Sequence, residues 1–212
     1  MSQDSWTAQQ WTEEGNVRAD QGQYLQALDA YNRSIEVKSS YASAYAYRGD
    51  AFRNLNRDDE ALADFEHALV LNPDESAAWQ GKTLLFLKQE KFSLAKISAE
   101  QVIRIGEGLN QNAWYLKGVA EVKLGRPEDG LRSFDKAIEI EPTREDFWKY
   151  KAFTLSQLGR NIEVLKCYEK LTEINPENPE FWNMKGQMHL KLGQINEANE
   201  AFSMAKNLIE KT

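Results

Sequence analysis

The segment NAWYLKGVAEVKLGRPEDGLRSFDKAIEIEP, residues 112–142, alternates aromatic, small and turn-forming residues in a fixed order. The residues in question are Trp114, Gly118, Gly125, Gly130, Phe134 and Pro142. The same order recurs along the chain, and five of the six tryptophans mark it, at Trp11, Trp79, Trp114, Trp148 and Trp182. These tryptophans stand 68, 35, 34 and 34 residues apart, and Tyr45 lies in the middle of the long step. A constant period near 34 residues predicts an array of helical repeats.

If the recurring aromatic residue is called position 4 of its repeat, small residues fall at positions 8 and 20. Position 8 is occupied by Gly15, Gly49, Thr83, Gly118, Ala152 and Gly186. Position 20 is occupied by Ala27, Ala61, Ala95, Gly130, Val164 and Ala198. Position 24 is aromatic except in the third repeat, with Tyr31, Phe65, Ala99, Phe134, Tyr168 and Phe202. Small residues allow two antiparallel helices to approach closely, and we expect the aromatic rings to fill the space beside them.

Turn residues divide each repeat into two segments of similar length. Position 15 is Gly22, Asn56, Gly125, Gly159 and Gly193 in five of the repeats. Glycine and asparagine tolerate the left-handed backbone that ends a helix. Prolines follow where a helix begins or must stop, as at Pro127 and Pro179. Each repeat is therefore predicted to hold one helix over positions 1–14 and a second over about 16–30.

The whole pattern resembles the tetratricopeptide repeat, in which tryptophan, glycine, tyrosine, alanine, phenylalanine and proline recur over 34 residues. The resemblance implies an all-α, right-handed solenoid of six helix-turn-helix repeats. Its expected borders are 8–41, 42–75, 76–109, 111–144, 145–178 and 179–212, after a lead-in over 1–7. We expect one elongated domain over 8–212, since such arrays bury their core only between neighbouring repeats.

The ends and the third repeat depart from this pattern. Positions 21 and 28 become polar together only in the last repeat, at Asn199 and Lys206. A solvated end is typical of a capping repeat, so six repeats are expected to complete the array. The third repeat has Gly81 and Ala99 in unusual places and ends in an extra residue within Gly106-Glu107-Gly108. Two interpretations stay open for that connection, neutral drift in a tolerant loop or a flexible joint over 104–112.

Composition narrows the class of function. The formal net charge is −7 and the pI is about 5.1, which disfavours non-specific binding to nucleic acid or to an anionic membrane. No stretch approaches the roughly 18 apolar residues of a membrane span, and residues 1–10 do not form a signal segment. The single cysteine, Cys167, excludes an intramolecular disulfide. A soluble cytoplasmic protein is expected.

No arrangement of residues in the sequence points to catalysis. There is no glycine-rich phosphate loop, and His67 and His189 lack metal-ligand spacing to each other or to Cys167. His189 takes the place of phenylalanines in sister repeats, which favours a packing role. The sequence therefore predicts a protein that is not an enzyme and has no cofactor, metal site or catalytic residues.

A row of cations recurs at position 7, at Arg48, Lys82, Lys117, Lys151 and Lys185. The row could be a basic track for an acidic partner. Alternatively, each aliphatic stem covers a neighbouring helix while its charged end reaches water or a nearby acid.

The resemblance implies that positions 2, 5, 6, 9, 12 and 13 of the first helix of each repeat line a concave groove. The predicted peptide-binding residues are Asn16, Tyr47, Asp50, Arg53, Asn54, Leu84, Lys88, Tyr115, Val119, Lys123, Lys149, Tyr150, Phe153, Asn183, Met184 and Gln187. Aromatic residues on a stripe that packing does not need favour a partner site, although the same residues could pack within the array. We hypothesise that apolar side chains of a bound peptide contact Tyr115, Tyr150 and Phe153, while its acidic part faces the groove lysines.

The resemblance also allows one known binding mode to be checked residue by residue. Members of this family that clamp the carboxylate end of chaperones need lysine and asparagine at positions where this chain has Thr12 and Tyr47. The same clamp needs lysine and arginine where the third repeat has Ala77 and Gly81, so chaperone-tail binding is not expected. The sequence predicts a non-catalytic interaction module or assembly scaffold that binds a protein or peptide. The alternatives are a homo-oligomeric scaffold and a regulatory subunit of a separate enzyme.

Overall fold

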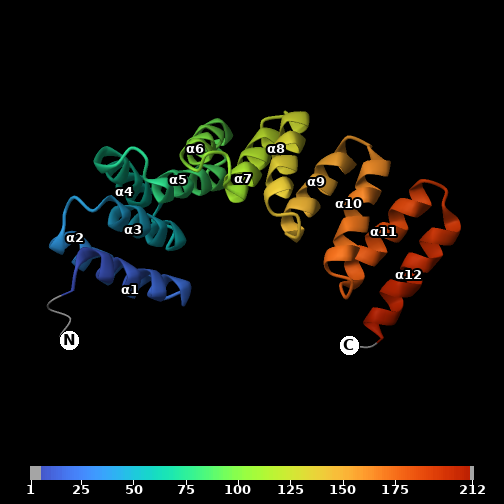
Figure 1. Ribbon diagram of the computed structural model, residues 1–212, viewed down its shortest axis with the longest axis horizontal. Coiled ribbons are helices and arrows are strands. Elements are labelled where there is room, and N and C mark those ends of the chain that lie inside the picture. Colours follow the sequence, from blue (N-terminus) through green and yellow to red (C-terminus); the bar gives the residue numbers. More distant parts are fainter. Residues whose placement is uncertain (1–5, 211–212) are drawn as a thin grey trace. The chain divides into compact units, whose positions relative to one another are not determined.

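The computed structural model describes residues 6–210 and divides them into two compact units that meet in the sequence at Leu109 and Asn110 (Figure 1). The first unit contains α1 (Ala8–Asp20), α2 (Tyr24–Val37), α3 (Ala42–Asn54), α4 (Asp58–Leu71), α5 (Ser76–Lys88) and α6 (Phe92–Ile105). The second unit contains α7 (Gln111–Lys123), α8 (Pro127–Ile140), α9 (Glu145–Gln157), α10 (Asn161–Ile174), α11 (Pro179–Lys191) and α12 (Ile195–Ile209). The part of the chain that the structure describes contains no strand.

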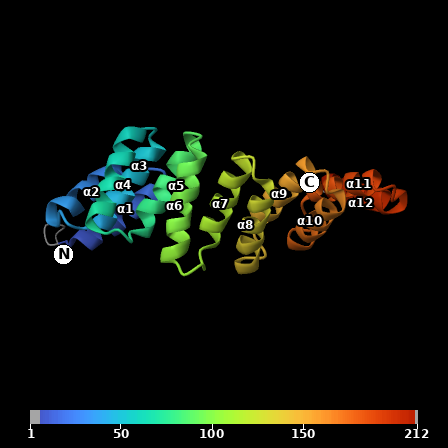
Figure 2. The same cartoon turned by 90° about the horizontal axis from the view of Figure 1, so that it is seen from above.

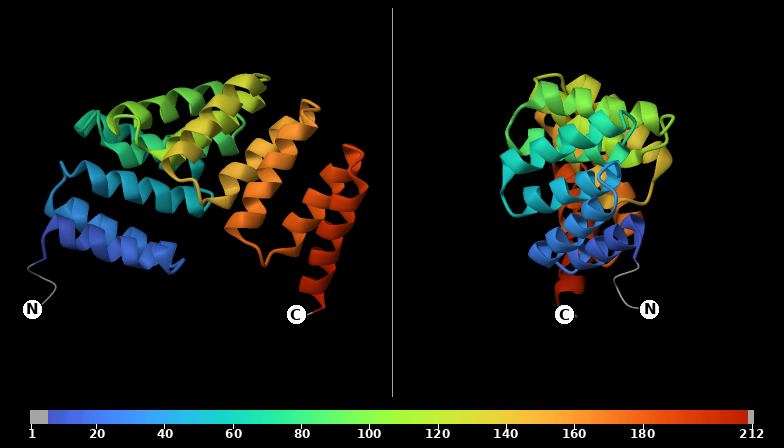
Figure 3. Two further views of the ribbon diagram at one scale, coloured as in Figure 1. Left: turned by 45° about the vertical axis from the view of Figure 1, so that its right-hand side comes forward. Right: turned by 90° about the vertical axis from the view of Figure 1, so that its left-hand side faces the viewer.

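The predicted repeats are confirmed as helix pairs. Each predicted repeat contains one helix that begins at its first residue and a second that begins at its seventeenth. Within each unit, every helix pair contacts the next, as α3 contacts α2 and α5 in the first unit. In the second unit α9 contacts α8, and α11 contacts α10 (Figures 2 and 3). The prediction of a single elongated array over 8–212 concerns both units together and stays a prediction.

Helix ends follow the residues that the sequence places there. Thr7 and Gln10 form a capping box at the start of α1, and Pro127 and Pro179 are the first residues of α8 and α11. The turn inside each pair adopts a left-handed backbone, with φ near 73° at Gly22 and Gly125. The third repeat has Glu90 at this position, with φ 56°. This turn therefore forms without the glycine or asparagine that the other repeats have at this position.

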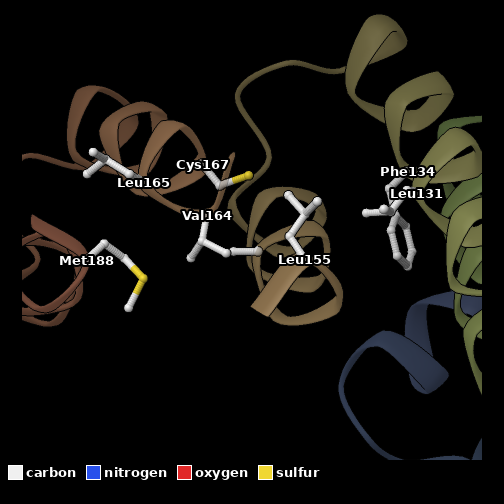
Figure 4. Close-up of a cluster of buried hydrophobic side chains, with 8 residues drawn as sticks. Leu131, Phe134, Leu155, Val164, Leu165, Cys167 and Met188 are labelled. Atoms are coloured by element: carbon white, nitrogen blue, oxygen red, sulfur yellow. The ribbon is translucent and has the colours of Figure 1, made fainter. Parts of the chain in front are cut away.

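The core of each unit lies between its helices. In the first unit Phe65 is fully buried, together with Ala61, Ala68, Ala78 and Leu85. In the second unit side chains from α8, α9, α10 and α11 pack into one cluster (Figure 4). That cluster contains Leu131, Phe134, Ala152, Leu155, Val164, Leu165, Cys167 and Met188. No helix among the described residues is both long and apolar enough to cross a bilayer.

Close approach within a pair depends on position 8. A Cβ added to Gly118 would lie 2.6 Å from Cε1 of Phe134, which is the position-24 ring of the same repeat. Gly15, Gly49 and Gly186 meet the corresponding rings in the same way. The third repeat has Thr83 and Ala99 at these two positions, while a Cβ on Gly81 would clash with the Phe65 ring of the preceding repeat. Gly81 therefore makes room for a ring of the preceding repeat, whereas the glycines at position 8 make room for a ring of their own repeat.

Candidate functional site

In the first unit, predicted groove residues of α3 and α5 surround a hollow of about 200 Å³. Tyr47, Asp50 and Arg53 of α3 line it together with Leu84 of α5. The remaining lining residues are Ala46, Ala77, Gln80 and Gly81. All four occupy the expected stripe positions, but none is among the predicted peptide-binding residues.

Internal contacts occupy the polar groups of this hollow. Arg53 forms an ion pair with Asp50 at 2.7 Å, and the Asn54 amide donates to the carboxylate and the backbone carbonyl of Asp50. The Tyr47 ring stacks on Tyr31 with 6.3 Å between ring centres. Burial, reinforced by the nearby Glu75 carboxylate, raises the pKa of Tyr47. The negative charge of Asp50 is therefore largely neutralised by Arg53.

Three predicted residues of the first unit do not line this hollow, namely Asn16, Asn54 and Lys88. Asn16 accepts a hydrogen bond from the Tyr31 hydroxyl at 2.8 Å. The Lys88 ammonium group binds Asp58 at 2.7 Å and Asn56 at 2.9 Å, at the turn between α3 and α4. Lys88 therefore already holds an acidic group from its own chain, and Asn16 contributes to the packing of α1 against α2.

In the second unit, α7 and α9 form a hollow of about 460 Å³ lined by Lys123, Asp146, Lys149, Tyr150 and Phe153. Four of these five residues were predicted from the sequence, and Asp146 also falls on the predicted stripe. Tyr150 is 42% exposed and Phe153 is 57% exposed. Large apolar side chains this accessible are the residues that interfaces use as anchors. We call this set the α7–α9 hollow.

Tyr115 and Val119 do not line the α7–α9 hollow but pack against the buried cluster of the second unit. The Tyr115 ring meets Tyr150 edge-on with 5.2 Å between ring centres and lies 5.2 Å from Phe147. Burial, followed by the neighbouring Tyr150, raises the pKa of Tyr115. Val119 packs against the buried cluster of the unit. Both residues therefore contribute to packing, which is the second of the two roles considered for the stripe.

The two lysines of the α7–α9 hollow, Lys123 and Lys149, differ in whether an acid of the protein already binds them. Lys149 forms an ion pair with Asp146 at 2.9 Å, and the hydrogen bond with that carboxylate raises the pKa of Lys149. Lys123 forms no ion pair with any described residue. An acidic ligand in this hollow would therefore find Lys123 free and Lys149 already partnered.

The predicted residues of α11 do not join this hollow. Asn183 lines a separate depression with Pro179, Phe202 and Ile209. Met184 is half-buried, and Gln187 is exposed. The predicted set thus separates into local clusters within each unit.

The cations of position 7 serve the packing of repeats in most cases. Arg48 binds Asp64 at 2.7 Å, and each of the five cations lies over the position-4 ring of its own repeat. Lys117 binds the buried Glu121 at 2.7 Å, and Ser133 donates to the same carboxylate. This network explains the acidic residue Glu121 at a position where three sister repeats have Phe52, Phe86 and Leu155. These contacts favour the covering role over a continuous basic track.

Other reactive side chains are isolated. Cys167 is buried, and desolvation raises its pKa to about 11. His189 is buried and shares a 2.7 Å hydrogen bond with Gln194. Within residues 6–210 no three His, Cys, Asp or Glu side chains are grouped as metal ligands would be.

Models of the tetratricopeptide repeat match residues 12–76 and 167–199, across helix pairs of both units. The chain belongs to the tetratricopeptide repeat family. A model described as the bacterial transcriptional activator domain matches residues 48–178. That match begins in α3 and ends after α10.

Curated tetratricopeptide relatives match only part of their own length. The cell division cycle protein 27 homolog of Caenorhabditis elegans is 31% identical over 97 residues, which cover 46% of this chain and 12% of the relative. The protein STIP1 homolog of Dictyostelium discoideum is 28% identical over 105 residues, which cover 50% of this chain and 19% of the relative. The chain thus spans less than a fifth of either relative.

Solved structures share the fold at low sequence identity. The tetratricopeptide protein YrrB, described as having an unusual peptide-binding site, gives a TM-score of 0.69 at 23% identity, with 85% of this chain and 93% of YrrB covered. PilF of Pseudomonas aeruginosa gives a TM-score of 0.81 at 13% identity, with 97% and 93% covered. These likenesses support the tetratricopeptide architecture and no particular partner.

Proposed function

We propose that this chain is a non-catalytic interaction module that binds a peptide segment on the first helices of its repeats, with the α7–α9 hollow as the main contact. The observation that carries the proposal is the exposure of Tyr150 and Phe153 beside a hollow that their own unit does not fill. An exposed aromatic pair held on one rigid helix loses little conformational entropy when a partner covers it.

The supporting rings make this contact well ordered before binding. Tyr115 packs edge-on against Tyr150, and Phe134 lies 6.3 Å from Tyr150 between ring centres. A peptide with an apolar side chain would bury the free faces of Tyr150 and Phe153. An acidic residue of the same peptide could reach Lys123 at the edge of the hollow.

Family membership supports the class of function. Tetratricopeptide repeats present extended surfaces to protein partners, and YrrB is described as a peptide-binding member. The match to the bacterial transcriptional activator domain supports a second candidate, in which the array is the regulatory part of a transcription activator. In that case the bound protein would be another part of the transcription machinery, reached through the same hollow.

The proposal is tested with peptides selected from a random library on the wild-type protein. Tyr150→Ala combined with Phe153→Ala is expected to weaken binding more than about tenfold, because aromatic anchors dominate interface energetics. Binding is measured by isothermal titration calorimetry. The matched control is Ile162→Ala combined with Ile195→Ala, two residues that are each 62% exposed and lie outside the hollow.

The outcomes separate the candidates. If the Tyr150 and Phe153 variant retained its affinity for the peptide, the proposal would be rejected. Loss of affinity in the control would place the peptide near Ile162 and Ile195 instead. Concentration-dependent mass in light scattering, abolished by the same aromatic changes, would instead favour the homo-oligomeric scaffold.

A further inference from the structure

A second hollow in the second unit shares no residue with the α7–α9 hollow. It lies between α9, α10 and α11 and has a volume of about 720 Å³. Its lining contains two indoles and four lysines, with two glutamates and one threonine: Trp148, Trp182, Lys151, Lys166, Lys170, Lys185, Glu169, Glu173 and Thr172. We call it the two-indole hollow. Its lysines stand out in a chain whose formal net charge is −7.

Two of the four lysines are partnered within the protein and two are not. Lys151 binds Asp135 at 2.5 Å, and Lys170 binds Glu173 at 2.6 Å. Neither Lys166 nor Lys185 has a carboxylate of the described residues within 4.0 Å. Both ammonium groups are therefore available to an external anion.

Lys185 lacks the ion pair that two of its sister lysines make with the preceding repeat. Lys82 forms an ion pair with Glu66, and Lys151 forms one with Asp135. In both cases the acid lies on the second helix of the preceding repeat in the same unit. The equivalent acid for Lys185 is Glu169, and both residues line the two-indole hollow without forming an ion pair. Lys185 lies over the Trp182 ring, 5.1 Å from its centre, as Lys82 and Lys151 lie over their own tryptophans.

The floor of the hollow also differs from other repeats. Position 28 is Ile35, Leu69, Ile103 and Ile138 in the first four repeats and Thr172 here. The Thr172 hydroxyl donates to the Glu169 backbone carbonyl at 2.8 Å. A smaller, polar residue therefore replaces the apolar side chain that fills this place elsewhere, and the space between the two indoles stays open.

From these features we propose that the two-indole hollow binds an acidic peptide segment. Glutamate or aspartate side chains of the segment pair with Lys166 and Lys185, and an apolar side chain lies against the indoles. Binding needs both the lysines and the indoles. Exposed ion pairs alone add little affinity in the presence of salt, and the aromatic surface alone does not distinguish acidic from neutral peptides. This surface acts in addition to the α7–α9 hollow and does not depend on the function proposed for it.

The test uses the full chain and a short fluorescein-labelled peptide of glutamates flanking a central leucine. Fluorescence anisotropy measures its affinity for wild type and for Lys166→Gln combined with Lys185→Gln. A loss of about fivefold to twentyfold is expected from two exposed charge contacts. The variant should fold normally, because neither lysine has an ion-pair partner to leave behind. Circular dichroism and thermal unfolding verify this point.

Three controls make the result decisive. Lys136→Gln combined with Lys206→Gln removes the same charge from exposed sites outside the hollow, and it should leave affinity within about twofold. The same peptide with glutamine in place of glutamate should bind at least about tenfold more weakly. Tyr150→Ala with Phe153→Ala should retain binding.

Equal losses in the two lysine variants would show non-specific charge attraction and overturn the proposal. Equal affinity for the glutamine peptide would overturn it as well, and so would the absence of binding to wild type. Loss of binding only in the Tyr150 and Phe153 variant would assign the acidic peptide to the α7–α9 hollow instead.

Discussion

Position 8 and position 24 of each repeat act as a matched pair of residues. Where position 8 is glycine, a large ring takes the space that a Cβ would need, as Phe134 does opposite Gly118. Where position 8 is Ala152, the opposing Tyr168 ring is only half-buried. Where it is Thr83, no ring is present and Ala99 stands opposite. In the four repeats with glycine at position 8, the missing side chain therefore makes room for the ring at position 24.

This pairing predicts energetic coupling. Gly118→Ala is expected to destabilise the protein by about 1–3 kcal/mol, because the added methyl group forces Phe134 out of place. In a Phe134→Leu background the same change should cost at least about 1 kcal/mol less. Urea unfolding of the four proteins measures the difference. Additive effects of the two changes would show that the ring and the methyl group do not compete.

The left-handed turn in the third repeat predicts a stabilising substitution. Glu90 adopts φ 56°, a conformation that glycine reaches without the clash a Cβ causes. Glu90→Gly should raise the free energy of unfolding by about 0.5–1 kcal/mol, since relief of strain outweighs the added flexibility of the unfolded chain.

Two further variants isolate this effect in the same unfolding measurement. Glu90→Ala removes the side chain but keeps the strain, so it should change stability by less than about 0.5 kcal/mol. Gly193→Ala, at φ 76° with no neighbour within 4 Å of the added Cβ, should cost about 1 kcal/mol. A stabilising effect of Glu90→Ala equal to that of glycine would assign the gain to charge rather than to the backbone.

At the scale of elements, helix pairs are held by polar contacts as well as by the apolar core. The indole N–H of Trp148 donates to the Pro142 carbonyl at 2.8 Å, and Trp182 does the same with Pro176. The tryptophan of one repeat thus binds the turn that precedes it. The sequence pattern shows that the tryptophan and the proline recur, but it does not show that a hydrogen bond joins them.

The buried network between α7 and α8 gives a prediction at this scale. Lys117→Met would leave the Glu121 carboxylate buried and without its cation, so a loss of about 3 kcal/mol is expected. Adding Glu121→Leu should restore most of the stability, because sister repeats have Phe52, Phe86 and Leu155 at this position. Thermal unfolding compares the variants. A double variant as unstable as Lys117→Met would mean that the ion pair itself stabilises the unit.

Helix bounds were predictable from the sequence to within a few residues, because glycine, asparagine and proline have backbone preferences that do not depend on distant contacts. The α7–α9 hollow was predictable in part. Periodicity places Tyr150 and Phe153 on the stripe of groove residues. It does not reveal the ion pairs that Lys149 forms with Asp146 and Lys88 with Asp58. Those pairings depend on side-chain directions and on neighbouring turns. The two-indole hollow was missed because its opening arises from one missing ion pair and from Thr172.

At the scale of the whole molecule, each unit has a core of its own. Phe65 and Leu85 anchor the first, while Phe134, Leu155 and Met188 pack within the second. In repeat arrays stability is a sum over repeats and the contacts between adjacent ones. A stretch of three complete repeats therefore contains both kinds of contact, and residues 1–109 and 110–212 are each expected to fold when produced separately.

The prediction is measured by circular dichroism and urea unfolding of the two halves. Each should be helical and lose its structure in a cooperative transition. Fragment 110–158 is the matched control, because it ends between α9 and α10 and removes Val164 and Met188 from the cluster that contains Leu155. That fragment should be largely unfolded, since its apolar faces lack their partners. If a half behaved like this fragment, its own core would be insufficient and the six repeats would have to fold together, as the prediction of one array implies.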